Sequence, residues 1–233
     1  VPIIKIMTNQ SKVFLDGEAD AWVDRNNENI LNNQSSVNHS RKILTQWCSS
    51  RKENISKILE IGAGNGIPLA YLADQLDADA YGIEPSSKAV KLWEEQKQFI
   101  QGGEKTNLQV GIASKLPFSN GKFDMVIFGF CLYLIDRKDL FQSISEADRV
   151  LKDGGLLAII DFDPSKPYQN LYSHKQGIKS YKNNYSDIFL SSGHYALMYK
   201  HSYSHEGSTF HETDDERVSL SLLFKQEEKV YSN

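Results

Sequence analysis

A ten-residue run at positions 57–66 constrains the fold of this chain more than any other stretch. It reads Lys-Ile-Leu-Glu-Ile-Gly-Ala-Gly-Asn-Gly, and Pro68 follows shortly after it. Residues 57–61 predict a buried strand, the three glycines predict a tight turn, and Pro68 fits the first turn of a helix, where its missing N–H is not needed. Glycines in such a turn permit unusual backbone angles and let a ligand approach the main chain closely. A strand, a glycine turn and a helix in this order form the nucleotide-binding corner of an open α/β sheet.

Two details separate this run from a dinucleotide-binding fingerprint. That fingerprint reads Gly-x-Gly-x-x-Gly, but Ile67 occupies the position of its third glycine. An acidic residue, Glu60, also lies inside the strand, where the dinucleotide pattern is apolar. The run closely resembles the first motif of class I S-adenosylmethionine-dependent methyltransferases, in which the acid helps to hold the methionine end of the cofactor. The residues that this resemblance assigns to the cofactor are Glu60, Gly62, Ala63, Gly64 and Gly66.

A second acidic residue follows at the distance typical of this family. Residues 80–84 predict a strand, and Glu84 ends it 18 residues after Gly66. A carboxylate can accept hydrogen bonds from both hydroxyls of a ribose. The resemblance therefore implies that Glu84, with Pro85 beside it, holds the ribose of the cofactor. The alternative is a solvated acid at the end of a strand.

Residues 111–118 are similar to the loop that follows the third strand in the family. That loop often carries an aspartate that binds the adenine amino group, and this chain has Ile112 at the same position. We expect Ile112 and Ala113 to flank the adenine ring, with Ser114 or a main-chain carbonyl as its polar partner.

Residues 123–130 resemble the fourth strand of the family and the turn after it. The resemblance, which covers roughly residues 55–162, places Phe128 and Gly129 against the cofactor. Tyr133 lies where many members carry a histidine near the transfer site. Tyr133 is therefore a candidate catalytic residue, and packing in the core is the alternative.

The order of the predicted segments indicates an α/β fold. Short apolar runs alternate with helical patterns, as in parallel strands joined by crossover helices. The predicted strands are 57–61, 80–84, 108–112, 123–128 and 156–160, with antiparallel strands at 195–203 and 218–224, and the predicted helices are 14–25, 37–48, 69–73, 86–100 and 139–152. The fold class is a Rossmann-like three-layer sandwich. Its mostly parallel, seven-stranded sheet ends in an antiparallel C-terminal hairpin.

At 233 residues the chain suits a single domain. The domain is expected to have four parts, which are an N-terminal helical lid (1–50), a cofactor-binding core (51–163), an acceptor cap that leads into the first hairpin strand (164–205), and the last strand with a tail (206–233).

The predicted lid contains an aromatic residue and an arginine on one helix face. Trp22 and Arg25 are three residues apart, so a helix can present both to the same side. Members of the family often place such a pair over the methionine carboxylate of the cofactor. The alternative is a helix packed through Trp22 with Arg25 in solvent.

The predicted cap has an unusual composition. Residues 164–205 hold seven of the eleven tyrosines and four of the six histidines, but Asp187 is their one acid. Tyrosine and lysine suit a polar or anionic acceptor, and they also suit a nucleic-acid strand. We expect Tyr172, Lys179 and Tyr181 to bind the acceptor and His174 to act as a base, with His194 and His201 as alternatives. Tyrosines that merely pack on the sheet are the competing interpretation.

Charge, cysteine content and hydropathy exclude other classes. A net charge of −4 argues against general affinity for nucleic acid. Cys48 and Cys131 have no metal or redox spacing, and the longest apolar run, 125–135, is shorter than the ~20 residues of a membrane helix. We therefore expect a cytoplasmic protein that does not bind membranes. Asp161 and Asp163 share one side of a strand, but without a further acidic cluster we expect no metal.

These observations predict an S-adenosylmethionine-dependent methyltransferase that O-methylates a small polar acceptor, such as a sugar or another metabolite. An RNA or protein methyltransferase, and a non-catalytic module that binds S-adenosylmethionine, are the alternatives. The sequence leaves the acceptor and the oligomeric state open.

Overall fold

The structure is a computed structural model that describes residues 9–32, 39–51, 54–205, 207 and 209–227. Parts of the predicted lid (1–8 and 33–38) and the end of the predicted tail (228–233) lie outside the described residues. Within the described part of the chain, no helix is both long and apolar enough to cross a lipid bilayer.

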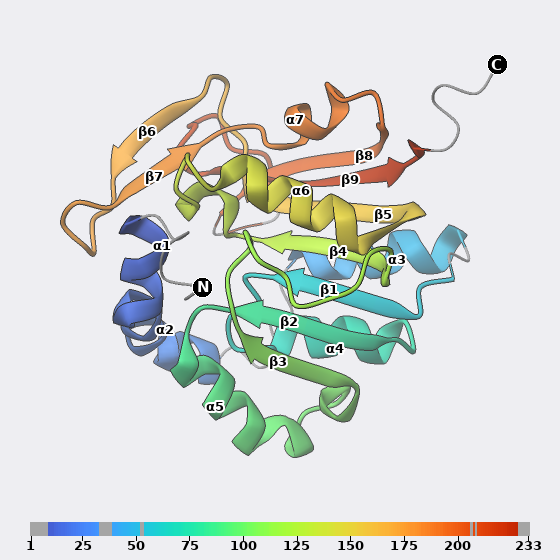
Figure 1. The fold of residues 1–233 in the computed structure, drawn as a ribbon, viewed down its shortest axis with the longest axis horizontal. Helices are drawn as coiled ribbons and strands as arrows, with labels where there is room; N and C mark the ends of the chain where they lie inside the picture. The colour runs from blue at the N-terminus through green and yellow to red at the C-terminus, as the bar shows by residue number, and fades with distance from the viewer. Residues whose placement is uncertain (1–8, 33–38, 52–53, 206, 208, 228–233) are drawn as a thin grey trace.

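Among the described residues, seven strands form one sheet in the order β3-β2-β1-β4-β5-β9-β8 (Figure 1). The strands are β1 (Lys57–Ile61), β2 (Asp79–Glu84), β3 (Thr106–Val110), β4 (Phe123–Gly129), β5 (Leu151–Phe162), β8 (Tyr195–Ser204) and β9 (Arg217–Lys225). The first five run parallel, and β9 is antiparallel to both of its neighbours, β5 and β8. This topology confirms the predicted sheet with its antiparallel C-terminal strands.

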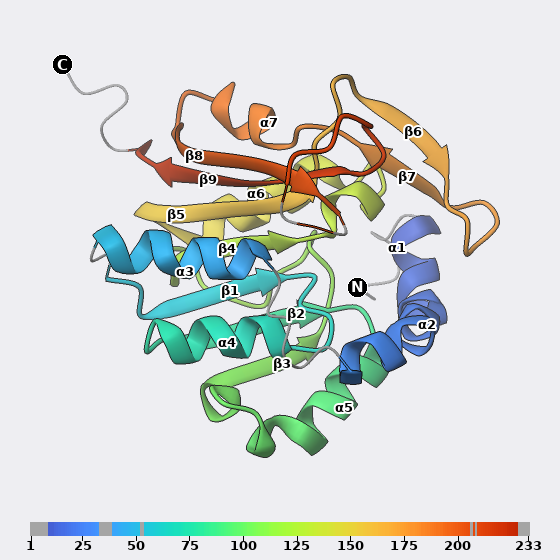
Figure 2. The ribbon, with the colours of Figure 1, turned by 180° about the vertical axis from the view of Figure 1, so that it is seen from behind.

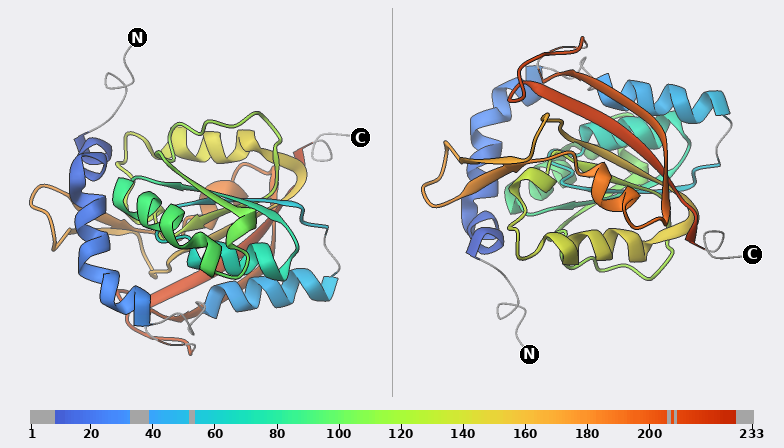
Figure 3. Two further views of the ribbon diagram at one scale, coloured as in Figure 1. Left: turned by 90° about the horizontal axis from the view of Figure 1, so that it is seen from below. Right: turned by 90° about the horizontal axis from the view of Figure 1, so that it is seen from above.

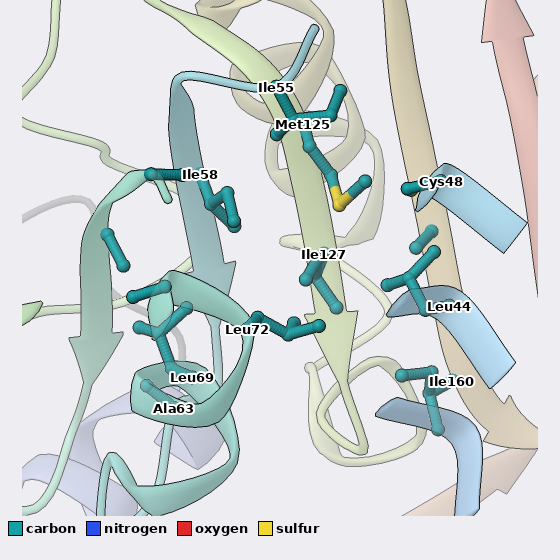
Figure 4. Packing of buried hydrophobic residues seen from close by; sticks show 14 of the residues in the cluster. Leu44, Cys48, Ile55, Ile58, Ala63, Leu69, Leu72, Met125, Ile127 and Ile160 are labelled. Carbon is teal, nitrogen blue, oxygen red and sulfur yellow. The ribbon is translucent and has the colours of Figure 1, made fainter. Parts of the chain in front are cut away.

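Helices cover both faces of the sheet, so side chains on both sides of each central strand are buried. The helices are α3 (His39–Arg51), α4 (Ile67–Gln75) and α5 (Ser87–Gln96) on one face and α6 (Leu140–Val150) on the other (Figures 1 and 2). In β1, Ile58 belongs to the core beneath α3 and α4, whereas Leu59 belongs to the core beneath α6. Figure 4 shows the first of these cores, in which Leu44 and Cys48 of α3 face the strands.

Residues 164–205 form a hairpin of their own before they enter the main sheet. In this hairpin β6 (Tyr168–Leu171) pairs antiparallel with β7 (Lys179–Lys182), and the short helix α7 (Ser186–Leu190) follows. The hairpin lies beyond the carboxyl ends of the parallel strands. The N-terminal helices α1 (Asn9–Val13) and α2 (Ala19–Asn32) lie on the same side of the molecule (Figures 1 and 3).

Several predicted boundaries are wrong. β3 ends at Val110, the last residue to pair with β2, and not at residue 112. The helix predicted to reach residue 152 ends at Val150, because Leu151 is buried and pairs with Phe123 as the first residue of β5. The helix predicted over 86–100 ends as α5 at Gln96 and continues as a 3-10 turn.

The helix predicted over residues 14–25 is interrupted. Gly17 has a φ of 136°, which lies outside the helical region, within a π-helical turn over Phe14–Glu18. Helix α2 begins only after this turn. The N-terminal segment is therefore two short helical pieces joined at a glycine.

Gly66 is the glycine on which the corner between β1 and α4 depends most directly. It has a φ of 77° and precedes the first residue of α4. A Cβ atom at this position would lie 2.7 Å from the ring of Trp93 and 2.9 Å from Leu108 Cδ1. The turn, α5 and β3 therefore meet at a point where only glycine fits.

We expect Gly66→Ala to lower the free energy of unfolding by about 2–4 kcal/mol. The left-handed backbone would contribute roughly 1–2 kcal/mol, and the collision with Trp93 a similar amount. Urea denaturation measures this loss, and the slope of the free energy of unfolding against urea concentration should be the same in the variant and the wild type. Gly154→Ala is the matched control, since Gly154 has a φ of 74° but no atom within 4 Å of an added Cβ. Equal losses in the two variants would show that Trp93 moves aside without cost.

Candidate functional site

The glycine turn after β1 packs against the loop after β4. The main-chain N–H groups of Gly62 and Ala63 donate to Ile83 O at 2.9 and 3.2 Å. A Cβ at Gly62 would lie 2.8 Å from Cys131 Cβ and 2.9 Å from the carbonyl oxygen of Gly129. Gly64 also has a positive φ, of 54°, but no atom lies within 4 Å of an added Cβ at this position. The turn is therefore closed on its inner side and open beside Gly64.

Glu84 connects this turn to the start of α5. Its Oε2 accepts a hydrogen bond from Gly64 N at 2.9 Å, and its Oε1 accepts one from Ser86 N at 3.0 Å. The residue is 8% exposed, and burial raises its pKa although these two hydrogen bonds act in the opposite direction. Each carboxylate oxygen keeps a second lone pair for another donor. The acid predicted to bind a ribose therefore lies directly beside the open position at Gly64.

Glu60 forms a buried ion pair with Arg41 of α3. Burial raises the pKa of Glu60 in spite of the arginine. No described residue donates a hydrogen bond to Glu60 Oε2 or accepts one from Arg41 Nε. A Cβ at Gly129 would collide with Glu60 Oε1, so the acid lies beneath this glycine. A buried acid in a strand needs a cation, but the sequence did not indicate that Arg41 supplies it.

The remaining predicted cofactor residues differ in their access to a ligand. Ile112 forms an isolated bridge with Lys115 after β3, and Ala113 is almost buried. The side chain of Phe128 is fully buried and packs near Phe189 of α7. Only the main chain of Phe128 can therefore reach a ligand, because its side chain points into the core beneath α6.

An aspartate attaches the N-terminal helix α2 to the beginning of α5. Asp20 accepts hydrogen bonds from Ser86 Oγ at 2.6 Å, Lys88 N at 3.0 Å and Ser87 Oγ at 3.3 Å. Burial alone would raise the pKa of Asp20, but these hydrogen bonds lower it on balance. Asp24 adds an ion pair with Lys88. Helix α2 is thereby fixed at the start of α5, next to Glu84.

The predicted lid pair, Trp22 and Arg25, occupies two different environments. Trp22 is 36% exposed. Arg25 Nη2 lies 2.7 Å from the buried Glu18 carboxylate and 3.4 Å from the hydroxyl of Tyr172 in the β6–β7 connection. The sequence signal for this pair is weak, since Glu18 lies seven residues before Arg25 with a helix break beside it. Arg25 therefore connects α2 to the β6–β7 hairpin.

The predicted acceptor residues divide into two groups. Tyr172 packs near Phe14 of the N-terminal segment, and the exposed His174 packs edge-on against Tyr172 at 5.2 Å. On β7, the Lys179 carbonyl accepts a hydrogen bond from Gln10 of α1 at 2.9 Å. Leu171, the residue before Tyr172, pairs with Lys179 in the hairpin, so the two groups are neighbours along the N-terminal segment.

Tyr181 lies on β7 beside the 3-10 turn η5 (Leu132–Leu134), where its ring centroid is 4.3 Å from the Arg137 guanidinium carbon. The alternative histidines are elsewhere. His201 of β8 meets His39 of α3 with 3.3 Å between their Nε2 atoms, and His194 precedes β8 at the opposite edge of the sheet.

Tyr133 and Asp161 lie together at the carboxyl end of β5. Asp161 accepts hydrogen bonds from Phe162 N at 2.8 Å and Tyr133 N at 3.3 Å. Burial raises the pKa of Asp161 to about 7, although these donors and Leu132 N oppose the shift. Burial raises the pKa of the Tyr133 hydroxyl, and the nearby charge of Asp161 raises it further. Tyr133 can therefore donate a hydrogen bond near neutral pH but is a poor base.

Asp163 does not share the surroundings of Asp161. Its carboxylate accepts hydrogen bonds from Lys200 Nζ at 2.8 Å and Ser202 Oγ at 2.7 Å. In the described part of the chain, no group of three or more histidine, cysteine or acidic residues is placed to hold a metal ion.

Residues 59–159 match the profile of a methyltransferase domain family. An uncharacterized methyltransferase of Synechocystis is 34% identical over 108 residues, which are 45% of this chain and 46% of that protein. The 2-phytyl-1,4-naphtoquinone methyltransferase of Nostoc punctiforme is 30% identical over 141 residues, 57% of this chain and 59% of the other. The chain thus spans about half the length of the curated relatives it matches.

The fold has a similar solved structure. The 1,6-didemethyltoxoflavin-N1-methyltransferase of Burkholderia thailandensis, with 1,6-didemethyltoxoflavin and S-adenosylhomocysteine bound, has a TM-score of 0.71. The likeness covers 97% of this chain and 92% of that one at 12% identity, so it bears on the fold alone. The glycine turn, Glu60 and Glu84 lie at one edge of the sheet, within the residues that match the methyltransferase domain profile, and over this core the chain is similar to S-adenosylmethionine-dependent methyltransferases.

Proposed function

We propose that the protein transfers a methyl group from S-adenosylmethionine to a hydroxyl of a small polar molecule, such as a sugar or another metabolite. The observation that carries this proposal is the open position at Gly64, with the Glu84 carboxylate hydrogen-bonded to its N–H. A ligand that lies against this backbone would meet the free lone pairs of a buried carboxylate, which suit the hydroxyls of a ribose.

The residues of this edge fit the cofactor. Glu84 would accept hydrogen bonds from the ribose, and the unpartnered Oε2 of Glu60 would accept one from the methionine ammonium group. Ile112 and Ala113 would flank the adenine, while Pro85 would border the ribose. The glycines of the turn and Gly129 would leave room for the bound cofactor. When bound, the cofactor would supply a methyl group that its sulfonium already activates.

The chain's own contribution would then be positioning and the exclusion of water. Helix α2, with Trp22 and Arg25, would cover the cofactor, because Asp20 fixes this helix beside Glu84. We propose that Tyr172, Lys179 and Tyr181 line the acceptor side. His174 and Tyr133 are the candidates for contact with the reacting hydroxyl.

Action on RNA or protein, or binding without catalysis, are the other candidates. The net charge of −4 does not favour RNA. The intact glycine turn and Glu84 do not favour a module that has lost catalysis. Incubation with methyl-labelled S-adenosylmethionine and separate fractions of small molecules, RNA and protein tests the proposal. Label should appear in the small molecules, and label in RNA or protein alone would contradict it.

We expect Gly64→Ala to weaken the binding of S-adenosylhomocysteine at least tenfold, because the new methyl group would occupy ligand space. Isothermal titration calorimetry measures the affinity. Gly154→Ala is the matched control, since both glycines have a positive φ and open surroundings, and it should bind like the wild type. Urea denaturation should give similar stabilities for the two variants. Unchanged affinity in Gly64→Ala would show that this turn does not line the cofactor site.

Asp161 predicts a pH dependence of stability. Because its pKa is raised from 3.8 to about 7, the folded protein holds this proton more tightly than the unfolded chain does. The contribution of Asp161 to stability should therefore be complete below about pH 4 and decline as the pH rises to about 7.

The measurement is the free energy of unfolding of the wild type and Asp161→Asn across this pH range. The free energy of unfolding of the wild type minus that of Asp161→Asn should decrease as the pH increases. The exposed Asp187 provides the control, and Asp187→Asn should follow the wild type. A pH-independent difference for Asp161→Asn would show that this carboxyl titrates normally.

A further inference from the structure

Four aromatic side chains, Phe130, Tyr133, Phe162 and His205, meet where β4, β5 and β8 end, and we call them the ring cluster. Phe162 and His205 are parallel, with an angle of 4° between the rings and 6.0 Å between their centroids. Phe130 meets His205 edge-on at 5.5 Å and Phe162 at 6.0 Å, and Tyr133 meets Phe162 at 5.1 Å. His205 is exposed, and the other three are partly exposed.

The strand order brings His205 to the same edge as the cofactor turn. β9 is antiparallel to both β5 and β8, so β8 runs in the direction of the parallel strands and ends at their carboxyl edge. The N–H of His205 donates to Glu216 O at 2.7 Å, which fixes its backbone just beyond β8. The sequence pattern predicts this strand, but only the pairing with β9 shows that it ends at the carboxyl edge.

Phe130 places the ring cluster beside the glycine turn. It directly follows Gly129, whose carbonyl oxygen lies against Gly62. Its φ of 51° is left-handed, which is unfavourable for a bulky side chain, and a hydrogen bond from its N–H to Ile160 O at 2.8 Å holds it there. Backbone strain of this kind is concentrated at ligand-binding sites. Here it directs the ring of Phe130 toward Phe162.

The charged groups next to the ring cluster already have partners. Lys182 Nζ lies 3.8 Å from the centroid of Phe162, and it forms an ion pair with Asp215 at 2.6 Å. Asp163 is occupied by Lys200 and Ser202. A sugar would need several free polar groups at this surface. The exposed imidazole of His205 and the partly exposed rings of Phe130 and Tyr133 instead suit a small metabolite that is flat and aromatic and carries a polar substituent.

Resting on the proposed methyltransferase function, we infer that the acceptor is a planar aromatic compound with a ring hydroxyl, and that it binds on the ring cluster. We further infer that His205 accepts the hydroxyl proton. The hydroxyl oxygen forms its new bond to the methyl carbon, the carbon–sulfur bond breaks with its electron pair left on sulfur, and the proton passes to the imidazole. Because His205 is exposed, it can release this proton to water.

His205 has a better position for this role than His174. The ring of His174 packs on Tyr172 in the β6–β7 connection, where the lid meets the hairpin. His205 contacts Phe130, one residue from the glycine that packs against the cofactor turn. A positioned histidine base contributes roughly 10²–10⁴-fold to a proton transfer.

The first experiment compares two probes of the same skeleton, 2-naphthol and decahydro-2-naphthol. Each is titrated into protein saturated with S-adenosylhomocysteine, and binding is followed by ligand-observed NMR. We expect 2-naphthol to bind at least tenfold more tightly than its saturated counterpart. Phe162→Leu, which keeps the apolar volume without the ring, should abolish most of this preference. Phe141→Ala removes a 72% exposed ring on α6 and should leave it intact. Equal affinities of the wild type for the two probes would overturn the aromatic class.

The second experiment measures methyl transfer to 2-naphthol from labelled S-adenosylmethionine. His205→Gln should lose at least 100-fold in rate while it binds 2-naphthol within about threefold of the wild type. Added imidazole should partly restore transfer in His205→Gly, which a structural role would not produce. His194→Gln, at the opposite edge of the sheet, is the control. Normal transfer by His205→Gln, or no transfer by the wild type, would overturn the role of His205.

These results separate the inference from the function on which it rests. Failure of the wild type to bind S-adenosylhomocysteine would contradict the methyltransferase proposal itself. Binding of S-adenosylhomocysteine without a preference for 2-naphthol would contradict the aromatic acceptor alone.

Discussion

The loops of the candidate site depend on hydrogen bonds from main-chain N–H groups to buried carboxylates. Glu84 accepts from Gly64 and Ser86, and so connects the turn after β1 to the start of α5. Asp161 does the same for the loop after β4, where Tyr133 N is one of its donors. Burial of these acids is unfavourable, as their raised pKa values indicate. Their removal would leave main-chain donors without partners, so the acids determine the shape of the loops as well as their chemistry.

The same acids give this edge of the sheet an unbalanced charge. Glu60 is matched by Arg41 and Glu18 by Arg25, whereas Glu84 is hydrogen-bonded by neutral main-chain groups. An edge with more buried carboxylates than arginines favours a ligand that carries positive charge. S-adenosylmethionine carries a sulfonium charge that S-adenosylhomocysteine lacks. Under the proposed function, methyl transfer would therefore remove the charge that this edge favours.

The sequence predicted those parts of the site in which the chemistry is local. The strand at 57–61, the turn after it and Glu84 at the end of β2 all occur as the motifs indicated. The apolar pattern after residue 110 extended the predicted third strand too far, because it does not distinguish a strand from a packed loop. Arg41 and Asp20 could not be foreseen in their roles, since each acts on a residue far away in the chain. The hairpin within 164–205 was missed, because its β6 face is exposed and lacks an apolar alternation.

The N-terminal segment crosses the carboxyl edge as two pieces that are attached to different elements. Gln10 of α1 donates to the carbonyl oxygens of Leu134 and Lys179, so this piece is held by η5 and β7. Helix α2 is held by Asp20 at the start of α5. Between the two pieces lies Gly17, whose φ of 136° no other residue adopts easily, and an added Cβ there would have no neighbours. A displacement of α2 would therefore break the hydrogen bonds of Asp20 and the contact of Arg25 with Tyr172, whereas the hydrogen bonds of Gln10 belong to the other side of the glycine.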